Sequence, residues 1–207
     1  MNTDDKNSSV YVTMQKILTH INSAFEEKNL SRNLAVIRNS VGKSYEDAAG
    51  VWPILLPHIP EEYLGNGSFS FEENALLVAL QLYAIGQQGS NKMKNDEKRK
   101  SIGWALQQLR NGDSTSLDKR FNTMITATTF EEFTYHLRQI FKLGKSDKMF
   151  ALNFSKLADD LFWYQNGRSK QISLKWARDY YRPYHKDDNN QSSTISTDND
   201  DHKKEAV

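Results

Sequence analysis

Apolar residues recur at steps of three and four along most of this chain, and this spacing constrains the fold more than any other feature. Such steps place side chains on one face of an α-helix. The pattern is clear over residues 10–28, through Val10, Met14, Ile17, Leu18, Ile21 and Phe25. No segment shows the alternation of apolar and polar residues that is typical of a strand. We therefore predict an all-α fold of eight or nine helices.

Capping residues and helix breakers predict where these helices begin and end. N-terminal signals precede four of them: Ser70 with Glu73, Ser101, Ser116, and Thr129 with Glu132. Gly112 and Gly144 are the expected stops after two of the helices. Residues 52–67 contain three prolines and two glycines, which indicates an irregular connector. Further helices are expected over residues 31–42, 153–165 and 169–182.

Breaks in the helical pattern divide the chain into five regions. We expect a disordered start (1–9), an N-terminal helical part (10–86), a basic connecting loop (87–100), a C-terminal helical bundle (101–185) and a disordered polar, acidic tail (186–207). The loop carries Lys92, Lys94, Lys98, Arg99 and Lys100. Sequence alone leaves open whether the two helical parts share one core.

Several classes of protein are excluded by what the chain lacks. Without cysteine it forms no disulfide, thiolate nucleophile, cysteine zinc site or iron–sulfur cluster. It has no apolar run of the length that spans a membrane, and its first residues do not resemble a signal peptide. We therefore expect a soluble, cytoplasmic protein with no membrane partner.

No catalytic, metal or cofactor motif is evident. The five histidines are not at metal-ligand spacing, and the glycine-rich phosphate and dinucleotide motifs are missing. Glu26 and Lys28 match a fragment of a nuclease site, but they fall on a predicted helix instead of a strand. Asp159 and Asp160 would point about 100° apart on a helix, so we expect one of them to pair with a nearby charge such as Lys156. We predict no enzyme activity.

The net charge of +1 hides an uneven distribution of charge. Residues 138–182 hold ten basic and four acidic residues, whereas the last 22 residues have a net charge of −3. Several helices carry cations as a stripe outside the apolar face, which suits contacts to phosphates more than reading of bases. A solvated face is the alternative. The candidate nucleic-acid-binding residues are Arg32, Arg38, Lys43, Arg120, Arg138, Lys142, Arg178 and Arg182.

The last predicted helix, SLKWARDYYRP, combines aromatic and basic residues. At 100° per residue, the aromatic side chains fall on a broad apolar arc and the cations on the remaining narrow one. We therefore expect Trp176, Tyr180 and Tyr181 to be core residues, not a surface for stacking bases. Lys175, Arg178 and Arg182 then remain as candidates to contact nucleic acid.

Five segments in succession resemble the CasB (Cse-two) family, the small subunit of the type I-E CRISPR Cascade complex. They are SIGWALQQLRNG, LDKRFNTMITA, FEEFTYHLRQIFKL, NFSKLADDLFWYQ and SLKWARDYYRP, and LAVIRNSVG in the N-terminal half adds to them. The resemblance covers about residues 12–183. Arg38, Arg120 and Arg138 lie in matching segments. Trp104 stands where some relatives have a basic residue, which puts a contact from that helix in doubt.

The resemblance implies two small packed helical bundles and a non-catalytic role. It implies other Cascade subunits with CRISPR RNA, a second copy of the chain, and the target and displaced DNA strands as partners. In such a complex, backbone contacts by the small subunit stabilise the R-loop for antiviral defence. The alternative is a helical scaffold that contacts only proteins.

Overall fold

The computed structural model describes residues 9–23, 27–89, 93, 95, 96, 98, 100–110, 114–147 and 150–182. These residues contain nine α-helical segments and no strand, with one isolated bridge between Asn95 and Leu152. The all-α prediction is therefore confirmed. Some predictions fall outside the described residues: those for residues 1–8, Phe25, Glu26, Lys92, Lys94, Arg99, Gly112, residues 183–185 and the tail from Lys186.

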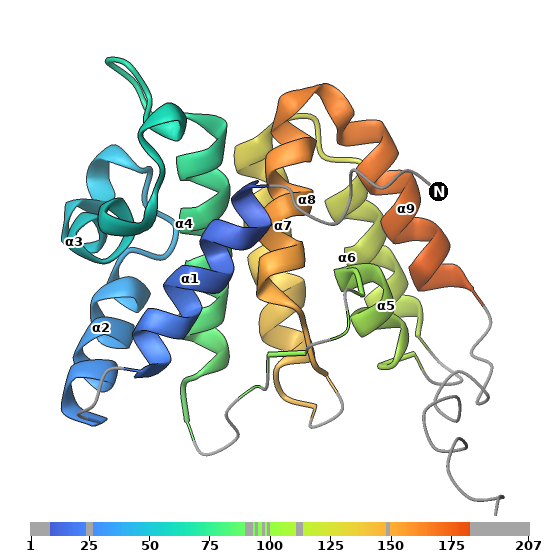
Figure 1. The fold of residues 1–207 in the computed structure, drawn as a ribbon. Helices are drawn as coiled ribbons and strands as arrows, with labels where there is room; N and C mark the ends of the chain where they lie inside the picture. Colours follow the sequence, from blue (N-terminus) through green and yellow to red (C-terminus); the bar gives the residue numbers. More distant parts are fainter. Residues whose placement is uncertain are drawn as a thin grey trace, which may run out of the picture.

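The helices are arranged along the chain as Figure 1 shows. They are α1 (Ser9–Ser23), α2 (Glu27–Asn39), α3 (Trp52–Leu55), α4 (Phe71–Gly86), α5 (Ile102–Gln107), α6 (Thr115–Ile125), α7 (Phe130–Gly144), α8 (Phe154–Trp163) and α9 (Ser169–Tyr181). The connector after α2 contains α3 and three 3₁₀ turns, at Glu46–Val51, Leu56–His58 and Glu61–Tyr63. Residues 52–67 are thus more ordered than we predicted, because their prolines start short turns of helix.

The predicted helix starts agree with the structure in part. Ser70 and Glu73 form the capping box of α4, and the Ser101 side chain accepts a hydrogen bond from the backbone of Trp104. The start predicted at Ser116 is wrong, because α6 already begins at Thr115.

The predicted capping box of α7 is only half formed. The Thr129 side chain accepts from the Glu132 N–H, but the Glu132 carboxylate accepts from the backbone of Thr128, one residue before the N-cap. Gly144, expected as the stop after α7, is its last residue.

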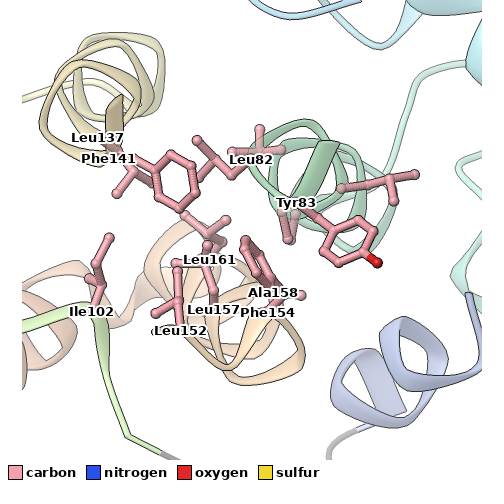
Figure 2. Close-up of a cluster of buried hydrophobic side chains, with 14 of the residues drawn as sticks. Leu82, Tyr83, Ile102, Leu137, Phe141, Leu152, Phe154, Leu157, Ala158 and Leu161 are labelled. Carbon is pink, nitrogen blue, oxygen red and sulfur yellow. The ribbon is translucent and has the colours of Figure 1, made fainter. Parts of the chain in front are cut away.

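Helix α8 joins the two halves of the chain. It packs against α1 and α4 of the N-terminal half, while α5 packs on α9 and α6 on α7. Figure 2 shows the centre of this arrangement, where Tyr83 of α4, Phe141 of α7 and Phe154 of α8 meet. The Tyr83 and Phe154 rings lie edge to face, with centroids 5.2 Å apart. One cluster of buried hydrophobic residues includes side chains from both halves, so they share a core.

Helices α5 and α9 approach each other closely at Gly103. A Cβ atom at this position would lie 2.1 Å from the carbonyl oxygen of Trp176. Only glycine therefore permits this approach.

A buried ionic network connects α8 to α9. The Lys156 Nζ donates to Asp159 Oδ2 and to Asp160 Oδ1, each at 2.8 Å, and the Trp176 Nε1 donates to Asp160 Oδ2 at 2.9 Å. Burial alone would lower the pKa of Lys156, but the charges of Asp160 and Asp159 outweigh it and raise that pKa above its ordinary value. Lys156 therefore stays charged and pairs with both aspartates, where we expected one.

Replacing Lys156 by Met should destabilise the fold strongly. The substitution leaves the buried Asp159 without an ion pair and Asp160 with only the longer contact to Lys175, and breaking a buried pair costs about 3–5 kcal/mol in comparable cases. Chemical denaturation of the variant, with the exposed Lys170→Met on α9 as control, measures this loss. Equal free energies of unfolding for the two variants would show that the network contributes nothing.

The stability of the protein should fall in mild acid because of His58. Its imidazole lies 4.7 Å from that of His20, centroid to centroid, and burial, His20 and Lys16 together lower the pKa of His58. The unfolded chain then binds the proton more readily, so stability decreases as the pH falls below about 6.5. We expect the drop in Tm between neutral and mildly acidic pH to be smaller in His58→Gln than in the parent protein. An identical drop would exclude His58 as a cause.

Candidate nucleic-acid interface

The eight cations predicted to bind nucleic acid lie on four helices and the residues that follow them. Arg32 and Arg38 belong to α2, Arg120 to α6, Arg138 and Lys142 to α7, and Arg178 to α9, while Lys43 and Arg182 follow α2 and α9. Six are exposed, and Arg38 and Arg138 are half-buried. None of the eight forms an ion pair with a carboxylate of the residues that the structure describes.

One flank of α7 concentrates positive charge. The Arg138 guanidinium is half-buried, and burial lowers its pKa without removing its charge. No carboxylate in the described part of the chain lies close enough to balance it. Lys142 follows one turn later and is exposed. A cation that has lost part of its hydration and has no counter-charge favours binding of an anion.

Arg38 lies in a groove between α2 and the end of α4. Its Nη1 is 3.5 Å from the carbonyl oxygen of Ala84, in the last turn of α4. The groove has a volume of about 250 Å³ and is lined by Leu30, Ser31, Leu34, Arg38, Gln87, Gln88 and Gly89. The C-terminal end of α4 is the negative end of the helix dipole, which attracts the positively charged guanidinium.

Lys145 is a further cation of this surface, which we did not predict. Burial lowers the pKa of Lys145, and the positive charge of Arg38 lowers it further. Cations from the two halves of the chain therefore lie within electrostatic reach of each other. Lys145 is three residues after Lys142 and keeps helical backbone angles, φ −54° and ψ −27°. Its spacing could have identified it, but the stop expected at Gly144 left it out of the helix.

Arg120 lies apart from Arg38 in the sequence and on another helix. It lines a shallow surface depression with Thr115, Ser116 and Lys119 at the start of α6. Lys119 places a further cation beside Arg120 in this depression, and we did not predict it.

Of the three aromatic residues of α9 that we predicted to lie in the core, two are buried there and one is not. Trp176 and Tyr180 are fully buried, and the Tyr180 ring stacks on Phe121 with centroids 4.0 Å apart. The prediction for Tyr181 is wrong, because this residue is 42% exposed and its hydroxyl donates to Asn122 at the surface. It follows Tyr180 directly, so the helical turn carries it to the edge of the core.

The cations of α9 are not equivalent. The Lys175 Nζ lies 3.8 Å from Asp160 Oδ1 and so belongs to the ionic network. Arg178 and Arg182 are exposed and have no ion pair within the described ranges. Lys100, which precedes the neighbouring α5, places its Nζ 4.6 Å from the centroid of the Trp104 ring on that helix, so a positive charge lies beside the tryptophan.

In the part of the chain that the structure describes, no group of three or more His, Asp or Glu side chains is placed to hold a metal ion. No helix there is both long and apolar enough to cross a membrane.

Comparison with solved structures finds the same fold. CasB from Thermobifida fusca aligns with a TM-score of 0.67 and 23% identity, over 84% of this chain and 98% of that one. M. ruber CasB aligns with a TM-score of 0.62 and 24% identity, over 82% and 93%. A chain of a CRISPR RNA-guided surveillance complex aligns with a TM-score of 0.67 and 17% identity, over 84% and 94%. No curated protein matches the sequence.

The family relationship rests on the sequence itself. The family model for CRISPR-associated protein Cse2 matches residues 33–181, which include α4 to α9 and all the predicted cations except Arg32 and Arg182. The motif succession that resembles CasB lies almost entirely within this range. The chain therefore belongs to the CRISPR-associated Cse2 family.

Proposed function

We propose that this chain is the non-catalytic small subunit of a type I-E CRISPR surveillance complex and binds nucleic-acid backbone there. Membership of the Cse2 family supports the assignment to such a complex. The shared fold with a chain of a CRISPR RNA-guided surveillance complex agrees with it. Its partners would be the other Cascade subunits with CRISPR RNA, a second copy of the chain, the target DNA and the displaced strand.

The observation that carries the proposal is the state of Arg138. Its guanidinium is partly withdrawn from water and lacks a carboxylate within the described structure. Buried charges in proteins are normally paired, and a phosphate offers a bidentate partner for a guanidinium. Lys142 and Lys145 continue the positive flank toward Arg38. A phosphate of the nucleic-acid backbone would supply the counter-charge that the described residues do not.

Backbone binding suffices for a role in R-loop formation. Replacing a DNA duplex by an RNA–DNA hybrid is nearly balanced in free energy, because the hybrid is about as stable as the duplex. Protein contacts to phosphates of either DNA strand then tip the exchange toward the R-loop. Such contacts require cations at the right positions, but no residue that reads bases.

Charge reversal separates this function from that of a scaffold. In a reconstituted complex, the triple change Arg38→Glu, Arg120→Glu and Arg138→Glu should leave assembly intact and weaken R-loop formation at least about tenfold, since each lost phosphate contact lowers affinity and salt sensitivity. Mobility shift of a labelled target duplex measures R-loops, and size-exclusion chromatography measures assembly.

A matched control alters charge by the same amount elsewhere. Lys16, Arg168 and Lys170 are cations outside the predicted set, with Lys16 and Lys170 exposed on α1 and α9. Reversing these three should have a much smaller effect. Normal R-loop formation by the Arg38, Arg120 and Arg138 variant, or by a complex without this subunit, would contradict the proposal. The alternative, a scaffold that contacts only proteins, would then remain.

A further inference from the structure

Tyr135 on α7 is the most exposed of the large hydrophobic side chains in the described residues. It is 54% exposed, and its hydroxyl forms no hydrogen bond with the rest of the described structure. The exposed Tyr181, in contrast, is held by its hydrogen bond to Asn122. The contact that orients the Tyr135 ring is with the neighbouring His136, at 5.2 Å between centroids and 77° between planes. Tyr135 therefore presents aromatic surface to solvent without serving the core.

The ring lies on the positively charged flank of α7. At 100° per residue, Arg138 and Lys142 are about 60° and 20° from Tyr135 around the helix, on the same side. The exposed apolar residue of this helix, Leu143, lies about 80° away on the opposite side. Arg138 and Lys142 are about 4.5 Å and 10.5 Å further along the helix axis. Tyr135 thus continues the row of cations and is separate from the apolar surface around Leu143.

An aromatic ring in a row of cations suits one form of nucleic acid. Cations beside the ring bind phosphates, and the ring stacks on a base that has no stacking neighbour of its own. Bases of a duplex already stack on each other and are closed to a side chain at the surface. The same flank would therefore bind a single strand through phosphates and a base, but a duplex through phosphates alone.

A protein partner fits this surface less well. Tyrosine and arginine are enriched at protein interfaces, but lysine is depleted there and the interface centre is rich in apolar contacts, whereas Lys142 lies beside this ring. Tyr135 is next to two cations that have no carboxylate among the described residues, and its apolar neighbour is on the other flank.

We propose that Tyr135 stacks on an unpaired base and gives the α7 surface a preference for single-stranded nucleic acid. This inference rests on the proposed function and adds a residue that selects the form of the ligand. Sequence preference is not expected, because every base offers a face to stack on.

Binding of the purified full chain to oligothymidine and to a duplex of equal length tests the inference. Tyr135→Ala should weaken binding to oligothymidine by about fivefold or more and leave duplex binding nearly unchanged. Tyr135→Phe keeps the ring and should bind as the parent protein does. Leu143→Ala, an exposed residue on the opposite flank, is the matched control and should change neither affinity.

The outcomes separate this inference from the proposed function. If the parent chain binds both ligands in a salt-dependent manner but Tyr135→Ala weakens neither or both equally, stacking by Tyr135 is excluded and the proposed function stands. If the parent chain binds neither ligand, both fail. If Tyr135→Ala impairs assembly of the complex and leaves strand binding intact, the residue contacts a protein instead.

Photo-crosslinking gives a direct readout of the contact. A single strand that carries 5-iododeoxyuridine crosslinks on irradiation to aromatic side chains against which the base lies. We expect peptide mass spectrometry to identify Tyr135 as a crosslinked residue, and a halogenated duplex to give little product there. Efficient crosslinking at other residues with none at Tyr135 would overturn the inference.

Discussion

The rest of the structure depends on how the buried charge of α8 is balanced. Lys156, Asp159 and Asp160 all lie in the core, where separate charges would be strongly unfavourable. Their mutual pairing, with the hydrogen bond from Trp176, fixes α9 against α8. Trp176 in turn packs against Phe133, with ring centroids 5.6 Å apart. This contact links the network to α7, the helix that carries Arg138.

This arrangement separates the two signs of charge. Several carboxylates of the C-terminal half have partners within the chain: Asp118 accepts from Tyr180 and pairs with Arg110, Asp179 accepts from Ser101, and Glu132 accepts from Thr128. Asp159 and Asp160 pair with Lys156, so neither forms an ion pair with any of the eight predicted cations. The uneven placement of charge, with ten basic and four acidic residues over residues 138–182, therefore gives this part of the chain positive charge although the net charge is only +1.

Local rules predicted most of the fold but only part of the candidate site. Helical spacing and the Ser70–Glu73 capping box are properties of neighbouring residues, so the sequence contains them directly. The exposure of Tyr181, the double pairing of Lys156 and the proximity of Lys145 to Arg38 depend instead on how distant helices pack. Whether the eight predicted cations bind nucleic acid depends on a ligand and stays a prediction.

The central claim is that the uncompensated charge of Arg138 meets a phosphate. The direct measurement is the dependence of the single-strand binding constant on salt, plotted on logarithmic scales, for the parent chain, Arg138→Gln and the control Lys170→Gln. Loss of one phosphate contact should reduce the slope by about 0.7 for Arg138→Gln, with little change for the control. A slope for Arg138→Gln that equals that of the parent chain would contradict the account.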